Sequence, residues 1–368
     1  MRRQTLAPRP DWPQRMAAIG FDFHTIDDQP YWVEGACYRF DERQIDELEA
    51  ATQNLHAMGL ELVEQIVRSG DYAPLGLNRY AAELIERSWR GREPALYGRM
   101  DLSYDGRRPP KLLEYNADTP TALFEASVVQ WFWLQDCLPQ ADQFNSIHEK
   151  LIAAWQRWPV ETRSPLHFAC VLDAPEDRAT CEYLRDTCTQ AGHDTVALDM
   201  SEIGWNGRAY TDLQEREIAR LFKLYPWEWL LDEAFGAHLH KTALRWIEPP
   251  WKMLLSNKAM LPLLWRRFPN HPNLLPASTN ARDIDGELVR KPRLGREGEH
   301  TAIYSAAGAI PSQDGDWIYQ SCWPLPDFDG LRPVIGSWIV GDEAAGIGIR
   351  EDDGPITRNT SRFVPHCF

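Results

Sequence analysis

The first 165 residues show helical periodicity that is interrupted by one strand pair. Residues 41–69 carry apolar side chains at intervals of three and four positions, which predicts a long amphipathic helix. Asp41 and Gln44 have the spacing of a capping box, so this helix is expected to begin there. Two apolar runs, 96–104 and 111–115, flank the turn-forming pair Asp105-Gly106 and predict an antiparallel hairpin. Further helices are predicted over 79–89, 121–136 and 145–157.

The middle of the chain has the pattern of a β-α-β unit. A strand is predicted over 167–172, a helix over 176–191 and a second strand over 194–199. The unit lacks a GxGxxG motif, so it does not predict a dinucleotide site. Two more helices are predicted, over 212–224 and 227–240.

After residue 251 the pattern changes to one helix, 257–268, followed by short strands. These strands are predicted at 288–292, 301–304, 317–321, 334–340 and 345–349, and we expect them to form an antiparallel sheet with a glycine-containing loop at 293–299. The chain is therefore divided into three expected parts, 1–165, 166–250 and 251–368. The expected fold class mixes α+β and α/β features.

Composition and charge exclude several classes of protein. Of the 368 residues, 43% are hydrophobic and 25% are charged, which is typical of a globular chain with a full core. The net charge of −15 provides no basic surface for a nucleic acid backbone. The seven cysteines are scattered without metal-ligand spacing, which indicates reduced thiols in a cytoplasmic protein. No apolar run is long enough for a membrane span, and the basic N-terminus lacks the apolar region of a signal peptide.

Four polar residues occupy alternate positions of the predicted hairpin, Arg99 and Asp101 on one strand and Glu114 and Asn116 on the other. Alternate side chains point to the same side of a strand, so the four are expected to converge on one face. Two carboxylates and an amide oxygen suit Mg²⁺, which often shares the phosphate oxygens of a nucleotide. Arg99 could hold a phosphoryl group beside the metal. The alternative is a solvated strand face with charge pairs between the strands.

Two further clusters carry side chains that suit phosphate. Lys258 lies at the start of the helix predicted over 257–268, and Lys291 lies near the end of a predicted strand, before the loop that contains Gly298. Glycines let backbone N–H groups approach phosphate oxygens, although the P-loop motif GxxxxGK[ST] is absent. Arg350 follows a Gly-x-Gly pair at 346–348 and could also reach a phosphate. A surface lysine beside an ordinary turn, and a β-bulge, are the respective alternatives.

An acidic cluster, Asp173, Glu176 and Asp177, follows the first strand of the middle unit. Ligands of open α/β sheets bind at the carboxyl ends of the strands, and carboxylates there could hold an ammonium group. The alternative is an acidic first turn that interacts favourably with the dipole of the following helix.

Together these residues resemble the synthetase part of glutathionylspermidine synthase and its stand-alone relatives, which are acid–amine ligases. The resemblance covers most of the chain. It rests on residues 21–24, 30–32, 99–125, 222–228, 256–262, 291–292, 336–338 and 346–352.

The resemblance implies an ATP-grasp fold with a pre-ATP-grasp α/β unit. In this family the metal ligands precede the nucleotide lysines, a circularly permuted order that the present sequence matches. By resemblance Asp101, Glu114 and Asn116 bind Mg²⁺. Arg99 then stabilises the transition state that leads to an acyl phosphate.

The resemblance also assigns the nucleotide contacts and the substrate contacts. Lys258, Lys291 and Arg350 are expected at the phosphates of ATP, Gln320 near the adenine, and Gly298 in the loop over the nucleotide. The remaining implied residues contact the two substrates: Thr119, Thr121 and Glu125 the peptide carboxylate, and Glu176 and Asp177 the amine.

The implied function is ADP-forming synthesis of an amide from a glutathione-like or peptide carboxylate and a polyamine or other amine. Both substrates are small molecules, and neither a nucleic acid nor a membrane is an expected partner. Two other functions stay open. A non-catalytic ATP-binding regulatory module would bind ATP without amine-dependent release of ADP. A metal-dependent hydrolase would act without a nucleotide.

Overall fold

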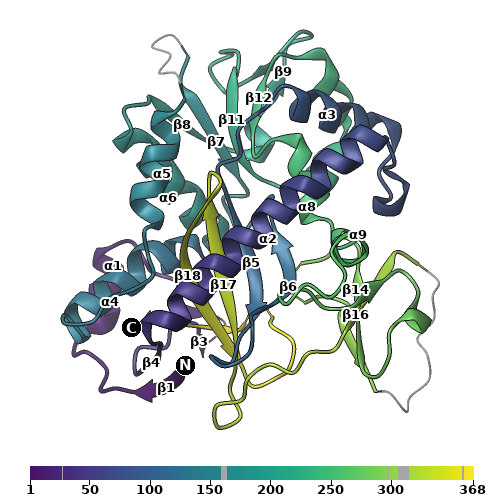
Figure 1. Ribbon diagram of the computed structural model, residues 1–368. Coiled ribbons are helices and arrows are strands. Elements are labelled where there is room, and N and C mark those ends of the chain that lie inside the picture. The colour runs from purple at the N-terminus through teal and green to yellow at the C-terminus, as the bar shows by residue number, and fades with distance from the viewer. Residues whose placement is uncertain (27, 159–163, 297, 306–314, 359) are drawn as a thin grey trace.

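The computed structural model describes residues 1–368 except 27, 159–163, 297, 306–314 and 359. The described residues form a five-stranded antiparallel sheet, a four-stranded parallel sheet and a four-stranded antiparallel sheet, together with smaller sheets. The long helix α2 (Glu42–Ser69) runs diagonally across the view of Figure 1. The fold is therefore mixed in helix and sheet, as the periodicity predicts.

The five-stranded sheet joins the beginning and the end of the chain. Its order is β19-β18-β17-β5-β6, and every neighbouring pair is antiparallel. The strands are β5 (Tyr97–Ser103), β6 (Lys111–Asn116), β17 (Arg332–Val340), β18 (Glu343–Asp352) and β19 (Arg362–Val364). The predicted hairpin is confirmed. The strands predicted at 334–340 and 345–349 also exist, but they belong to this sheet and not to the one formed by the other three strands predicted after residue 251.

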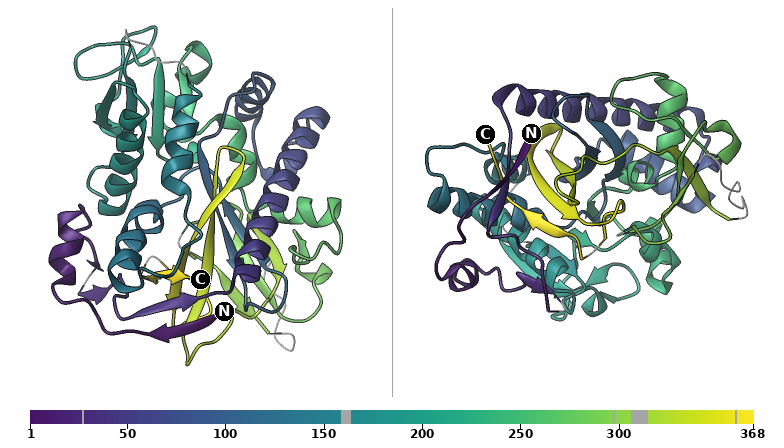
Figure 2. Two further views of the ribbon diagram at one scale, coloured as in Figure 1. Left: turned by 60° about the vertical axis from the view of Figure 1, so that its left-hand side comes forward. Right: turned by 90° about the horizontal axis from the view of Figure 1, so that it is seen from below.

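Helix α2 covers one side of this sheet (Figure 2). Its apolar stripe is buried, with Leu48 and Leu62 at 2% exposure or less. The predicted capping box is confirmed: the Gln44 N–H donates to Asp41 Oδ1 at 2.9 Å, and the Asp41 N–H donates to Gln44 Oε1 at 3.0 Å. The helix ends at Gly70, whose φ of 70° is left-handed and therefore favours glycine.

The parallel sheet has the order β12-β11-β7-β8. The predicted β-α-β unit is confirmed as β7 (Leu166–Cys170), α6 (Pro175–Gln190) and β8 (Thr195–Asp199). Two further strands, β11 (Arg220–Leu224) and β12 (Arg245–Ile247), extend the sheet on the side of β7.

The helix predicted over 212–224 is wrong. Residues 212–217 form a turn in which Asp212 Oδ1 accepts the N–H groups of Gln214 and Arg216 at 2.9 Å. Residues 220–224 form β11, and all five side chains are buried. Apolar residues at 218, 221, 222 and 224 imitate helical spacing because buried Lys223 and Arg220 interrupt the apolar run of the strand. Pairing with β7 and β12 therefore overrides the local pattern.

Three other predicted helices are interrupted or changed locally. The segment 227–240 contains α7 (Trp227–Asp232) followed by a 3₁₀ helix, Ala234–Lys241. The segment 257–268 contains α9 (Met260–Arg267), preceded by the short α8 (Met253–Ser256). The helical conformation is interrupted between them at Asn257. The Asn257 side chain donates to the Leu75 carbonyl and accepts a hydrogen bond from the Ala259 N–H. Within the segment 121–136 a π-helical turn, Glu125–Val129, leads into α4 (Gln130–Cys137).

The second antiparallel sheet has the order β13-β16-β14-β15. Its strands are β13 (Ala277–Ser278), β14 (Leu288–Pro292), β15 (Ala302–Tyr304) and β16 (Trp317–Ser321), of which the last three were predicted. Both termini meet in a small sheet of order β1-β4-β20, and Figure 1 shows them side by side.

The remaining named elements are β1 (Arg2–Thr5), α1 (Trp12–Ala18), β2 (Thr25–Ile26), β3 (Gln29–Pro30), β4 (Ala36–Arg39), α3 (Arg79–Arg90), α5 (Ile147–Gln156), β9 (Gly204–Trp205), β10 (Tyr210–Thr211) and β20 (His366–Cys367). None of the helices in the described ranges is both long and apolar enough to cross a bilayer.

Candidate active site

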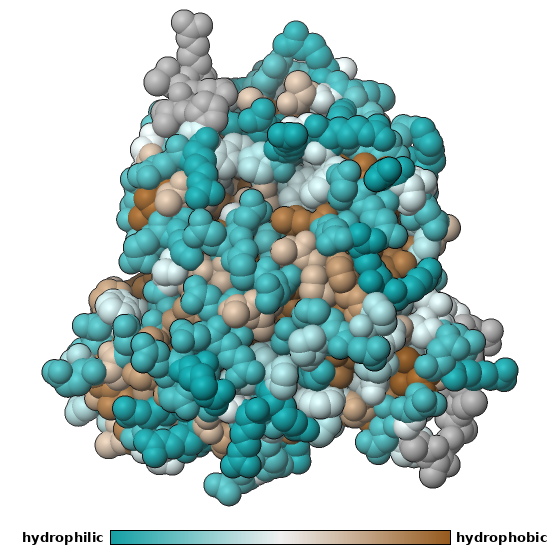
Figure 3. Space-filling model, viewed as in Figure 1, coloured by the Kyte–Doolittle hydropathy of each residue, from teal (hydrophilic) through white to brown (hydrophobic). Residues whose placement is uncertain are grey.

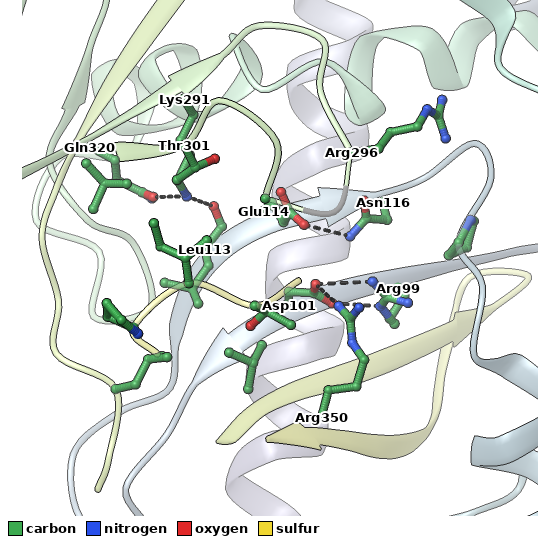
Figure 4. A pocket seen from close by; sticks show the side chains of 18 of the residues that line it. Arg99, Asp101, Leu113, Glu114, Asn116, Lys291, Arg296, Thr301, Gln320 and Arg350 are labelled. Atoms are coloured by element: carbon green, nitrogen blue, oxygen red, sulfur yellow. Dashed lines mark hydrogen bonds and ion pairs between the residues drawn. The ribbon is translucent and has the colours of Figure 1, made fainter. Parts of the chain in front are cut away.

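A cavity of about 300 Å³ lies where the two antiparallel sheets meet the parallel-sheet unit. The five-stranded sheet contributes polar side chains from β5, β6 and β18, and the second sheet contributes Lys291 and Gln320. The parallel-sheet unit contributes Asp177, at the start of α6, and Trp229 on α7. Figure 4 shows Arg99 and Arg350 turned toward Asp101, and Asn116 turned toward Glu114.

The four polar residues of the β5–β6 hairpin face each other directly. Arg99 is paired with Asn116, and Asp101 with Glu114, in the antiparallel register. All four line the cavity, so the expected convergence on one face is confirmed. Gly336 on β17 lies opposite Asp101. A Cβ at Gly336 would come within 2.8 Å of Arg99 Cδ, so glycine is what leaves room for the arginine side chain.

Asp101 is held by two guanidinium groups. Arg99 Nε donates to Asp101 Oδ1 at 2.7 Å and its Nη2 to Oδ2 at 3.2 Å, while Arg350 Nη2 donates to Oδ2 at 2.9 Å. Arg99 Nη1 also donates to the Thr121 carbonyl at 2.7 Å. Burial opposes the charge on Arg99, but the Asp101 carboxylate outweighs burial and raises the pKa of the guanidinium. Both side chains are therefore held in place, and they are buried at 6% and 4% exposure.

Glu114 is held by an amide and an ammonium group. Asn116 Nδ2 donates to Glu114 Oε1 at 3.1 Å, and Lys258 Nζ lies 3.1 Å from Oε2. Burial would raise the pKa of Glu114, but Lys258 and Lys291 overcome it and hold the pKa of this carboxyl well below its usual range. Lys258 does not line the cavity, but its ammonium group contacts Glu114, which does. Lys258 also donates to the Gly295 carbonyl at 2.6 Å.

Lys291 is buried between the two sheets. Its Nζ donates to the Leu113 carbonyl at 2.8 Å and to Gln320 Oε1 at 2.7 Å (Figure 4). Burial lowers the pKa of Lys291 to about 8, with Glu114 acting in the opposite direction. Gln320 Nε2 donates in turn to the Leu112 carbonyl at 3.0 Å, so Gln320 links Lys291 to β6.

The expected substrate residues are placed in two groups. Thr119, Thr121 and Asp177 line the cavity, whereas Glu125 and Glu176 do not; Gly298, expected in the loop over the nucleotide, also lines it. Glu125 is 1% exposed and accepts a hydrogen bond from the Tyr31 hydroxyl at 2.7 Å. Burial raises the pKa of its carboxyl, against the effect of that hydrogen bond. The structure thus brings most of the expected residues to one cavity and puts Glu125 behind its wall.

The sequence profile of the family described as "Glutathionylspermidine synthase preATP-grasp" matches residues 3–368. The chain belongs to this family. A Haemophilus influenzae protein named "Putative acid--amine ligase" is 42% identical, and the alignment covers 100% of both chains.

Longer relatives of the glutathionylspermidine synthase family share less sequence. Trypanothione synthetase of Crithidia fasciculata is 28% identical over 84% of this chain and 53% of its own length. The bifunctional glutathionylspermidine synthetase/amidase of Escherichia coli is 26% identical over 96% of this chain and 62% of its own length. The chain therefore spans little more than half of these two relatives.

A solved structure shows the same fold at low identity. The glutathione synthetase-like effector of Globodera pallida, in its apo form, aligns with a TM-score of 0.58 and 11% identity. The alignment covers 89% of this chain and 88% of that one.

Several lining residues of this family member were not singled out in the sequence. Arg296, in the glycine loop, donates to the Thr119 hydroxyl and, at 2.9 Å, to Glu228 on α7. An arginine two residues before Gly298 in a candidate phosphate loop was a signal that could have found it. The apolar lining had no such signal, because it comes from separate strands: Leu113, Val289, Ile303, Val334 and the 321–325 segment.

Cations dominate the polar part of the cavity. Arg99, Lys291, Arg296 and Arg350 line it, and Lys258 adds a fifth positive charge through Glu114. The lining carboxylates are Asp101, Glu114 and Asp177. The chain as a whole carries a net charge of −15, so this excess of positive charge is local to the cavity. Local positive charge favours a polyanionic ligand.

The donor set fits Mg²⁺ together with a polyphosphate. Both oxygens of Asp101 and both of Glu114 have cationic or amide partners, so a metal alone would have to displace them. Phosphate oxygens would give Lys258 and Arg350 new partners and release the carboxylates. In the described ranges, no group of three or more His, Cys, Asp or Glu residues is placed to hold a metal ion, so any metal here would need oxygen ligands from another source as well. Two carboxylates and an amide oxygen match the way Mg²⁺ binds with a nucleotide.

Proposed function

We propose that the chain is an ATP-dependent, ADP-forming ligase that joins a carboxylate to an amine through an acyl phosphate. One observation carries the proposal: Asp101 pairs with Glu114, and Arg99 with Asn116, inside a cavity that is also lined by Lys291. Oxygen ligands for a metal and cations for phosphates therefore stand together at hydrogen-bond distances. Family membership supports the same reaction class.

In this proposal Asp101, Glu114 and Asn116 hold Mg²⁺, whose charge offsets that of the phosphates. Lys258, Lys291 and Arg350 bind the phosphate oxygens. ATP transfers its γ-phosphoryl group to the substrate carboxylate, and ADP leaves. The resulting acyl phosphate is a good acyl donor. Catalysis is then mainly positioning and electrostatic stabilisation, which is what buried, fixed charges provide.

The apolar part of the cavity is the proposed site of the adenine. Val289, Ile303 and Val334 line it, next to Gln320 and the segment 321–325. Gln320 uses both ends of its amide within the protein, so its proposed role is to hold Lys291 toward the phosphates. In this arrangement the β5–β6 hairpin precedes the β14–β16 sheet in sequence, which is the permuted ATP-grasp order.

The proposed acid is glutathione-like or a peptide, and the proposed amine is a polyamine or another amine. Thr119 and Thr121 line the cavity beside Arg296, which would pair with a carboxylate of the acid. Asp177 lines the cavity and, with Glu176, would bind the ammonium group of the amine. The amine attacks as the free base, so a nearby carboxylate must accept its proton. The nitrogen then bonds to the acyl carbon, and phosphate leaves.

The experiment is a measurement of ADP release with Mg·ATP across a matrix of acids and amines. The acids are glutathione, γ-glutamyl compounds and short peptides; the amines are spermidine, putrescine and diamino acids. The proposal predicts release that requires both an acid and an amine, with a product mass equal to their sum less water.

Asp101→Asn should abolish this release, whereas Asp46→Asn, an exposed position on α2, should not. Tight ATP binding without amine-dependent release in any combination would contradict the proposal and favour a regulatory module. Equal turnover in the wild type and Asp101→Asn would contradict the assignment of the site.

A further inference from the structure

The turn between α2 and α3, residues 72–77, contacts both chain segments that carry the lysines of the candidate site. It contains a short 3₁₀ helix, Ala73–Leu75, and ends at Gly76, whose N–H donates to the Ala73 carbonyl at 3.0 Å. Hydrophilic residues cover most of the face that α2 crosses (Figure 3), but Tyr72 and Leu75 are buried beneath it. The turn is therefore anchored in the core, and its backbone has a defined shape.

The first of these segments is held through Asn257, the residue before Lys258. Asn257 is fully buried, and its Nδ2 donates to the Leu75 carbonyl of the turn at 2.9 Å. Its Oδ1 accepts the Ala259 N–H at 2.9 Å. The side chain of Asn257 thus fixes the backbone on both sides of Lys258 relative to the turn.

The second segment is held through Arg293, the residue after strand β14. The Arg293 guanidinium lies against Gly76: a Cβ at this glycine would collide with Nη1 and come within 3.2 Å of Cζ. Arg293 Nη2 lies 3.0 Å from Asp316 Oδ1, and the Arg293 N–H donates to the Asp316 carbonyl at 2.8 Å. Gly76 also has a left-handed φ of 68°, so both its backbone and its missing side chain favour glycine. Arg293 is therefore fixed between the turn and the start of β16.

The segment that Arg293 anchors holds Lys258 at both ends. The Lys258 N–H donates to the Arg293 carbonyl at 2.9 Å, and Lys258 Nζ donates to the Gly295 carbonyl at 2.6 Å while it lies 3.1 Å from Glu114 Oε2. Lys291 lies two residues before Arg293, near the end of β14. A displacement of Arg293 would therefore disturb the contacts of Lys258 and the end of the strand that carries Lys291.

We propose that Gly76 and Arg293 are positioning residues of the nucleotide site, through which the turn 72–77 places Lys258 and Lys291 for the phosphates of ATP. The proposal rests on the proposed function, in which these two lysines bind the phosphates. Neither Gly76 nor Arg293 lines the cavity, so both act through the lysines. Charged groups bind and stabilise a phosphate best when their supporting contacts hold them within a fraction of an ångström.

The test compares the dissociation constant for Mg·ATP, measured by isothermal titration, in the wild type and in variants of the full chain. Gly76→Ala displaces the guanidinium of Arg293, and Arg293→Ala removes it. The colliding atom is the end of a flexible side chain, so Gly76→Ala is expected to fold. Arg293→Ala tests the same contact without any change at the glycine.

Each substitution has a matched control. Gly70→Ala introduces the same backbone strain, since Gly70 has a φ of 70°, but a Cβ there would meet nothing within 4 Å. Arg185→Ala removes a half-buried arginine on α6 whose Nε donates to Glu182 at 3.0 Å, outside the cavity.

We expect a dissociation constant roughly tenfold higher in Gly76→Ala and in Arg293→Ala, and unchanged in both controls. The double variant Gly76→Ala/Arg293→Ala should bind no more weakly than Arg293→Ala, because no guanidinium is left to displace. Both glycine variants should lower Tm, because alanine strains a left-handed backbone, so a purely structural role would not separate their affinities.

Three results would overturn the proposal: an unchanged dissociation constant in Arg293→Ala, equal constants in Gly70→Ala and Gly76→Ala, or additive losses in the double variant. Absence of Mg·ATP binding in the wild type would contradict the proposed function itself, and this proposal with it.

Discussion

The protonation of Lys291 should control the affinity for ATP near neutral pH. Burial lowers the pKa of this ammonium group to about 8, and the group lies between the Leu113 carbonyl and Gln320. A lysine whose pKa is lowered loses its charge as the pH rises through that value. With a pKa of about 8, roughly 90% of Lys291 is charged at pH 7 and roughly 10% at pH 9. If only the charged form binds phosphate, the dissociation constant for ATP rises roughly tenfold over this interval.

The assay is isothermal titration with Mg·ATP at half-unit steps of pH, for the wild type and Lys291→Arg. An arginine stays charged throughout, so the variant should lose most of the pH dependence even if its affinity at pH 7 is lower. Lys241→Arg, at an exposed lysine outside the cavity, should keep the wild-type profile. Titration in buffers of different ionisation enthalpy should also show proton uptake on binding above pH 8. The reasoning is refuted if the Lys291→Arg profile is as steep as that of the wild type.

Three further substitutions test separate contacts. Asp101→Asn removes the carboxylate between two guanidiniums and should lower ADP release roughly 100-fold or more, measured with a coupled assay; a smaller loss would argue against this position as a metal ligand. Glu248→Gln leaves the ammonium of Lys252, 2.7 Å away and fully buried, without a carboxylate, and should cost about 3–5 kcal/mol in urea denaturation. Replacement of both partners, Glu248→Gln/Lys252→Met, should recover part of that loss. If the double variant recovers no stability, the loss in Glu248→Gln does not come from the unpaired ammonium group of Lys252. Arg296→Ala removes the link to Glu228 and should raise the KM of the acid roughly tenfold with little change in Tm, whereas an unchanged KM would exclude a contact with the acid.

The elements with strong local signals could be predicted from the sequence. The capping box at Asp41, the β5–β6 hairpin and the β-α-β unit each depend on residues close in sequence. The hairpin also predicted the convergence of its four polar side chains, because the strand repeat and the register fix which side chains share a face.

Features that depend on distant partners could not be predicted in the same way. Arg220–Leu224 forms a strand because its neighbours β7 and β12 pair with it, although its apolar spacing favours a helix. β17 joins β5 across more than two hundred residues, so the five strands predicted after 251 divide between two sheets. Glu125 lies behind the cavity wall because a π-helical turn and the Tyr31 hydroxyl hold it there, and neither has a sequence signature.

The most direct test of the proposed reaction follows one oxygen atom. The acid identified by the ADP-release matrix is labelled with oxygen-18 in its reacting carboxylate, and the phosphate released during amide formation is analysed by mass spectrometry. Formation of an acyl phosphate moves one carboxylate oxygen to the phosphoryl group, so the account predicts one labelled oxygen in inorganic phosphate for each amide formed. Unlabelled phosphate, or label that appears in AMP, would contradict it.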